Sequence, residues 1–176
     1  IGFIEQARRA EPNNILFAVN HARLLYKMGS PNSAALCLVR LGMEVKLGDD
    51  VVVILGKYLR ACQDPDEVWA EAFKEAIYDQ HYTSLIRLRA RHCLLSGEPD
   101  VAIEDIYYLL SCDENDKEAL GLLMSVYYEL YMYMEAGQIA LRVLRSDPGN
   151  VASLNTLGLC YGYLGRQQSA IKVFKR

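Results

Sequence analysis

Apolar and small residues near the end of the chain recur at the spacing of an α-helix. Four of them stand at positions i, i+3, i+4 and i+7, namely Leu154, Leu157, Gly158 and Tyr161. Residues at these intervals lie on one face of a helix. Gly165 then interrupts the pattern, and Ala170 and Phe174 open the apolar face of a second helix. The pattern therefore predicts two short helices that are joined by a turn.

The same pattern returns further up the chain at a fixed interval of about 34 residues. One interval earlier, the matching positions are Leu120, Leu123, Met124, Tyr127, Ala136 and Ala140. Glycines that can end a helix lie two intervals apart, at Gly29, Gly97 and Gly165. Small residues share one phase, at Ala34, Ala102, Ala136 and Ala170. Because these positions agree without an insertion, the pattern indicates a chain of repeated helix pairs.

This register fixes where each repeat is expected to begin and end. Partial repeats occupy 1–14 and 151–176, and full repeats occupy 15–48, 49–82, 83–116 and 117–150. First helices are expected near 15–28, 49–62, 83–96, 117–130 and 151–164. Second helices are expected near 1–10, 32–45, 66–79, 99–112, 133–146 and 167–176. Prolines at or just before the first turn of a second helix, where no amide donor is needed, support these limits at Pro31, Pro65 and Pro99.

The stretch Val51–Leu55 conflicts with this register when it is considered alone. Its β-branched residues are typical of a buried strand. The register places it in a first helix, and we follow the register because packing can outweigh a propensity cost of a few tenths of a kcal/mol per residue. The repeat at 49–82 is also the most divergent, since Leu59 replaces the tyrosine and Val68 the small alanine. We expect looser packing or an altered twist there.

These residues resemble the tetratricopeptide repeat (TPR) family, whose pattern pairs Leu-Gly-x-x-Tyr on one helix with Ala-x-x-x-Phe on the next. Leu157, Gly158 and Tyr161 match the first half, and Ala170 and Phe174 match the second. The resemblance covers the whole chain. It implies an all-α, right-handed superhelical solenoid of antiparallel helix pairs, with about five repeats in a single domain. It also implies a concave face that is lined mainly by first helices.

Composition and charge narrow the class of protein. The chain is 52% hydrophobic and 23% charged, which is an ordinary globular balance. A net charge of -3 does not indicate a nucleic-acid partner, and no apolar run approaches the roughly 18 residues of a membrane-inserting helix. The chain starts at Ile1 without Met and stops within the repeat pattern, so we expect it to be part of a longer protein.

Cysteines and catalytic motifs point to a protein that is not an enzyme. The five cysteines are widely spaced and form no C-x-x-C motif, which argues against disulfides and a zinc site and favours free thiols in the reducing cytoplasm. There is no G-x-S-x-G, H-E-x-x-H, Walker or dinucleotide-binding motif. The histidines lie in different repeats. We therefore predict no catalytic residue, no metal site and no cofactor.

The TPR resemblance implies that a partner binds in the concave groove, along a stripe of residues beside the packing positions of each first helix. The candidate peptide-binding residues of this stripe are Arg23, Tyr26, Lys27, Lys57, Arg60, Arg87, Arg91, Tyr128 and Tyr163. Bases predominate in the first three repeats, where Asp50 is the one acid. The stripe predicts a protein–protein interaction scaffold that binds an acidic segment, with tyrosines as flat apolar contacts. The alternative is that these bases are solvated or paired with neighbouring acids, since exposed pairs contribute only about 0–1 kcal/mol.

Two further functions and two further surfaces stay open. The chain could be a TPR chaperone that shields a secretion or assembly client, or a regulatory region of an enzyme that lies outside this segment. The run Tyr127–Met134 is either a contact site or a set of packing residues, and packing is the favoured interpretation. Ile171 and Phe174 leave an uncovered apolar face, which we expect a continuation of the chain, a partner or self-association to cover.

Overall fold

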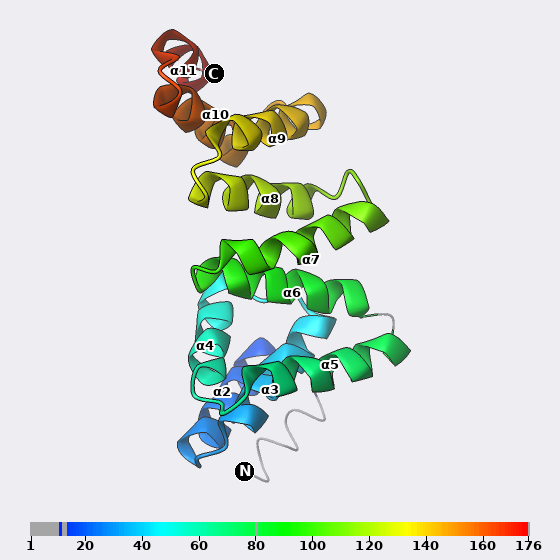
Figure 1. The fold of residues 1–176 in the computed structure, drawn as a ribbon. Coiled ribbons are helices and arrows are strands. Elements are labelled where there is room, and N and C mark those ends of the chain that lie inside the picture. Colours follow the sequence, from blue (N-terminus) through cyan, green and yellow to red (C-terminus); the bar gives the residue numbers. More distant parts are fainter. Residues whose placement is uncertain (1–10, 12–13, 80, 176) are drawn as a thin grey trace. The chain divides into compact units, whose positions relative to one another are not determined.

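The computed structural model describes residues 11, 14–79 and 81–175, with only the backbone of 77–79. Within them every regular element is an α-helix (Figure 1). The first helices are α2 (Ile15–Lys27), α4 (Asp49–Leu59), α6 (Tyr82–Leu95), α8 (Lys117–Glu129) and α10 (Val151–Tyr163). The second helices are α3 (Pro31–Glu44), α5 (Pro65–Asp79), α7 (Pro99–Cys112), α9 (Tyr133–Ser146) and α11 (Gln167–Phe174). These bounds confirm the predicted helices; the one predicted at 1–10 lies outside the described residues.

Local chemistry explains where the helices start and stop. The Asn150 side chain accepts a hydrogen bond of 2.9 Å from the Ser153 amide, and Asn14 and Asp116 cap α2 and α8 in the same way. Glycines end three first helices in the left-handed region, at Gly29 (φ 80°), Gly97 (φ 78°) and Gly165 (φ 73°). One repeat interval after Gly97, the same position is Tyr131, which adopts a φ of 60° without being a glycine.

The stretch Val51–Leu55 is helical, as the register predicted. Val51, Val52 and Leu55 are buried in α4, whereas Val53 is exposed. The buried side chains reach the core because α4 packs on α3 and α6. Packing of this apolar face therefore outweighs the strand preference of the β-branched residues.

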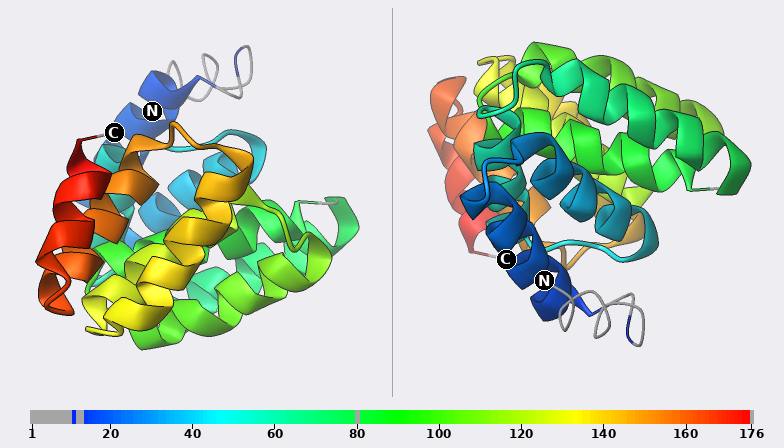
Figure 2. Two further views of the ribbon diagram at one scale, coloured as in Figure 1. Left: turned by 90° about the horizontal axis from the view of Figure 1, so that it is seen from above. Right: turned by 90° about the horizontal axis from the view of Figure 1, so that it is seen from below.

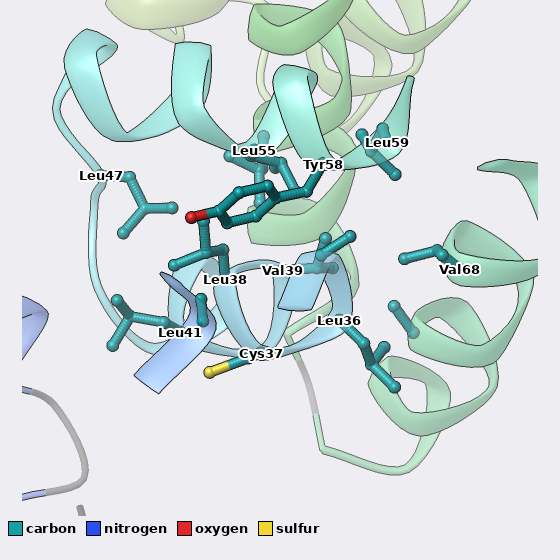
Figure 3. Close-up of a cluster of buried hydrophobic side chains, with 14 of the residues drawn as sticks. Leu36, Cys37, Leu38, Val39, Leu41, Leu47, Leu55, Tyr58, Leu59 and Val68 are labelled. Atoms are coloured by element: carbon teal, nitrogen blue, oxygen red, sulfur yellow. The ribbon is translucent and has the colours of Figure 1, made fainter. Parts of the chain in front are cut away.

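The chain divides into two compact units. Unit 1 comprises residues 1–96, and its core is centred on α3. This helix contacts α2, α4, α5 and α6, and it is buried on most of its circumference, with Leu38 and Val39 completely enclosed (Figure 3). A helix that is apolar nearly all round belongs in the middle of a core.

The repeat at 49–82 departs from a regular antiparallel pair. Within the described part of unit 1, α4 and α5 are not packed along each other; each packs instead on α3 and α6. Arg40 of α3 holds α5 through Glu75, which accepts from Arg40 Nε at 2.8 Å, and through Glu71 at 3.2 Å. The hydrogen bond from Arg40 lowers the pKa of Glu75, so the carboxylate stays charged at neutral pH.

Unit 2 comprises residues 97–176 and stacks its helices in sequence order. Helix α7 packs on α8, α8 on α9, α9 on α10 and α10 on α11, and α8 also touches α10 (Figures 1 and 2). At Gly137 of α9 a Cβ would make ordinary contacts with α10, at 3.7 Å from Leu157 and 3.8 Å from Cys160, so an alanine would also fit there. Gly158 has no room for a side chain beneath the Phe174 ring. Small residues thus allow the regular stacking that the repeat predicted.

Candidate partner-binding surfaces

The predicted binding residues are divided between the two units. Unit 1 carries the six bases and Tyr26, and unit 2 carries Tyr128 and Tyr163. The bases and the two later tyrosines therefore belong to different units of the chain.

In unit 1, two tyrosines from neighbouring first helices stack on each other. The rings of Tyr26 in α2 and Tyr58 in α4 have centroids 4.7 Å apart and planes 24° apart. The Lys57 ammonium lies 5.4 Å from the centroid of the Tyr26 ring. Burial raises the pKa of the Tyr58 hydroxyl, and the nearby charge of Arg23 opposes part of that rise. Sequence reasoning missed Tyr58, because the register counts its position among the interior ones.

Four exposed bases surround this tyrosine pair or follow it along the same helices, and they are Arg23, Lys27, Lys57 and Arg60. No ion pair from any of them is present among residues 14–79 and 81–175. We call these bases together with Tyr26 and Tyr58 the basic surface. Basic side chains that form no ion pair with acidic residues of the same protein are available to bind an acidic partner.

The other two predicted bases are engaged within their own unit. Arg91 of α6 is only 11% exposed; its guanidinium donates to the Leu47 carbonyl at 2.8 Å and pairs with the Asp49 carboxylate. It thereby fastens the connection between α3 and α4. Arg87 is half-buried and also makes an interaction within the protein. These two residues support the fold more directly than they offer charge to a partner.

In unit 2, Tyr128 and Tyr163 form one aromatic group with Tyr131 and Tyr133, which we call the tyrosine surface. Tyr133 and Tyr163 are stacked with centroids 4.4 Å apart and planes 5° apart. Tyr128 meets both of them edge-on, at 5.7 Å and 6.2 Å, and Tyr131 meets Tyr133 edge-on at 6.3 Å. The structure thus adds two tyrosines to the two that the stripe predicted.

The run Tyr127–Met134 divides between packing and exposure. The Tyr127 hydroxyl shares a 2.6 Å hydrogen bond with Tyr107 of α7, and this bond, followed by burial, raises the pKa of Tyr127 to about 12. Tyr131 and Met134, in contrast, are 78% and 57% exposed. The packing interpretation of the run is correct for Tyr127 and wrong for these two side chains.

The end of unit 2 formed by α10 and α11 is apolar and open. Val151, Ile171 and Phe174 are all more than half exposed, and a hollow of about 860 Å³ is lined in part by Leu154 and Val173. The uncovered face that the sequence indicated is therefore present. What covers it stays a prediction.

Reactive groups are dispersed. Of the described residues, no three histidine, cysteine or acidic side chains gather where a metal ion could be held. The side chains of Cys37 and His21 are both buried, with Sγ 3.8 Å from Nδ1. The five thiols are free, and burial raises the pKa of Cys62 and Cys160.

None of the helices found in 14–79 and 81–175 has the length and apolar character needed to cross a membrane.

Comparison with solved structures identifies the fold. A MamA RS-1 ArsTM double mutant is 16% identical with a TM-score of 0.57, and the match covers 89% of this chain and 88% of that one. YrrB, a TPR protein with an unusual peptide-binding site, is 17% identical with a TM-score of 0.53 over 98% of this chain and 89% of that one. The chain has the tetratricopeptide repeat fold. No protein-family model and no curated protein matches it.

The TPR fold explains why small residues recur at fixed intervals in the sequence. The repeated alanines are all buried, as close approach of neighbouring helices requires, and they are Ala34, Ala102, Ala136 and Ala170. At these identities the likeness concerns the fold alone, so the partner has to be argued from the surfaces of this chain.

Proposed function

We propose that this TPR chain is a non-enzymatic protein–protein interaction scaffold whose basic surface binds an acidic segment of a partner. The observation that carries the proposal is the set of exposed bases on α2 and α4 around a stacked tyrosine pair, without ion pairs of their own among the described residues. The peptide-binding site of YrrB supports the general class of function.

The chemistry of the basic surface suits an extended acidic peptide. Arg23 and Arg60 can each take a carboxylate with two parallel N–H donors, and Lys27 and Lys57 add point charges. The exposed part of the Tyr26 ring offers a flat apolar contact beside them. Because each exposed charge pair contributes only about 0–1 kcal/mol, several pairs must act together for useful affinity.

The test is a titration of the chain with a fluorescent peptide in which glutamate alternates with serine, and with a second peptide in which glutamine replaces glutamate. We expect the glutamate peptide to bind and its affinity to fall steeply with salt, since exposed charges are screened over roughly 8–10 Å at physiological ionic strength. Equal binding of the glutamine peptide would contradict an acidic partner.

A matched pair of charge reversals locates the site. Arg23→Glu/Lys57→Glu should reduce the affinity for the glutamate peptide roughly tenfold or more, whereas Lys172→Glu/Lys175→Glu changes the net charge equally on α11 and just after it and should have little effect. Circular dichroism should be the same for both variants. Equal losses would show attraction by net charge and no specific surface.

A further inference from the structure

The tyrosine surface of unit 2 differs in kind from the basic surface of unit 1. Tyr128 lies in the last turn of α8, Tyr163 ends α10, and Tyr131 and Tyr133 come from the turn after α8 and the first residue of α9. The rings interlock by one parallel stack and several edge contacts. Tyr131 and Tyr163 remain 78% and 62% exposed in this arrangement.

Tyr131 holds its place at a conformational cost. The equivalent position is a glycine with positive φ in three other repeats, at Gly29, Gly97 and Gly165. An L-residue with a bulky side chain rarely adopts the φ of 60° found at Tyr131. Because its ring is mostly exposed, the side chain buries little apolar surface in return. A strained residue with an exposed aromatic ring points to a role outside the fold.

The electrostatics of this surface favour a cation. Ring faces of tyrosine carry the negative part of the aromatic quadrupole. Helices α8 and α10 end here with the negative ends of their dipoles, but α9 begins at Tyr133 with a positive end, so the helix dipoles largely offset one another. The charged residues near these helix ends in sequence are Glu129, Glu135 and one base, Arg166, and α10 itself contains none.

We propose that the tyrosine surface binds an arginine side chain on an extended segment of a partner protein. A guanidinium can lie flat against an exposed ring and donate to tyrosine hydroxyl oxygens at the same time. A carboxylate would face ring faces and the two nearby glutamates, Glu129 and Glu135, which repel it. This partner chemistry is the opposite of that at the basic surface, and the two proposals are independent.

The hydroxyl groups of Tyr128 and Tyr133 remain neutral at physiological pH. Burial, followed by hydrogen bonding to Tyr163, raises the pKa of Tyr128 to about 12, and burial also raises the pKa of Tyr133. A neutral tyrosine hydroxyl oxygen can accept a hydrogen bond from a guanidinium. The attraction depends on the ring faces and the two glutamates, and the charge of Arg166 opposes it.

The test uses four peptides of one length on the whole chain, observed by NMR through the tyrosine ring signals. One carries two arginines in a glycine–serine background; the others carry lysine, neutral citrulline or a run of prolines. We expect saturable shifts of the Tyr128, Tyr131, Tyr133 and Tyr163 rings with the arginine peptide, binding a few-fold weaker with lysine, and none with citrulline. Citrulline binding as tightly as arginine would overturn the proposal, and so would tighter binding of the proline peptide.

Three substitutions separate an aromatic role from a merely apolar one. Tyr163→Phe keeps the ring face and should retain binding within about twofold, whereas Tyr163→Leu keeps apolar bulk and should lose roughly fivefold or more. Tyr107→Leu, on α7 outside the surface, is the matched control and should leave the affinity unchanged. Equal affinities of the Phe and Leu variants would refute the proposal.

Tyr131→Gly is a variant in which a loss of arginine binding cannot be attributed to unfolding. Glycine suits the positive φ at this position, so the variant should fold at least as stably as the parent while arginine binding falls severalfold. Unchanged binding by this variant would overturn the role of Tyr131. The glutamate peptide that probes the basic surface should bind this variant normally, so failure of one proposal is distinguishable from failure of the other.

Discussion

Units 1 and 2 are built from the same repeat pattern and reach different structures. In unit 2 each helix packs on the next in chain order, and its first helices α8 and α10 present tyrosines. In unit 1 the helices gather around α3, and the first helices α2 and α4 present bases beside a tyrosine pair. The repeat therefore determines where helices form, while residues outside the repeat pattern determine how they pack and what they offer to a partner.

The two units differ most clearly when α3, the central helix of unit 1, is compared with α9 of unit 2. Leu38 of α3 is completely buried, and three repeat intervals later the same position is Ala140 of α9, which is equally buried. Helix α3 contacts four other helices, so a large side chain fits where α9 needs only a small one. At these two positions the larger side chain lies on the helix that has more neighbours.

Leu38→Ala should have the largest effect, with a loss of about 2–5 kcal/mol in the free energy of unfolding, because it leaves a cavity in a core with little freedom to collapse. Urea unfolding followed by the fluorescence of Trp69, the single tryptophan, reports on unit 1. Leu16→Ala on the exposed side of α2, in the same unit, is the control and should change stability by less than about 0.5 kcal/mol. Similar losses for both variants would mean that α3 is not the centre of a tight core.

Arg91→Gln tests whether the bases of unit 1 have separate roles. Loss of the guanidinium removes hydrogen bonds to Leu47 and Asp49, and we expect a decrease of about 1–3 kcal/mol in stability. Arg60→Gln, an equal loss of charge at an exposed position, should change stability by less than about 0.5 kcal/mol but weaken binding of the glutamate peptide. The reverse order of stabilities would contradict the division between fold-supporting and partner-binding bases.

Much of the fold could be predicted from the sequence, because helix limits depend on local features that repeat. The glycines at 29, 97 and 165, the prolines at 31, 65 and 99, and the alanine series mark turns and close approaches at fixed intervals. The separation of α4 from α5 could not be predicted, since it depends on how α3 and α6 fill the space around them.

The binding residues were harder to predict, because engagement depends on contacts between distant parts of the chain. Arg23 and Arg91 occupy the same position of the repeat, two intervals apart. Only Arg91 lies beside the connection between α3 and α4, where it donates to the Leu47 carbonyl. Tyr58 was missed because its ring turns toward Tyr26 from an interior position. A partial signal for Tyr131 did exist, since Tyr131 and Gln63 are the two members of the series through Gly29, Gly97 and Gly165 that are not glycine.

Tyr131→Gly should raise the free energy of unfolding by up to about 1 kcal/mol. Relief of a left-handed backbone contributes about 1–2 kcal/mol, and the greater freedom of glycine in the unfolded chain offsets part of it. Thermal unfolding by circular dichroism measures the change. Gly165→Ala places a side chain at the matching φ of 73° and should lower stability by a similar amount. A loss of stability in Tyr131→Gly would show that the ring supports the fold of unit 2.

The smallest expected effect is a loss of stability at alkaline pH. The pKa of Tyr127 and Tyr128 is about 12 in the folded chain against 10 when unperturbed, so folding favours their neutral forms. Their contribution is complete below pH 10 and is lost as the pH rises from 10 toward 12. Partial exposure keeps the effect small. The urea midpoint by circular dichroism should therefore fall between about pH 10 and pH 12. Tyr107→Phe removes the hydrogen bond that raises the pKa of Tyr127 most, so its midpoint should fall less over the same range. An equally steep fall would mean that the loss arises elsewhere, for example at Tyr58, whose pKa is raised in unit 1.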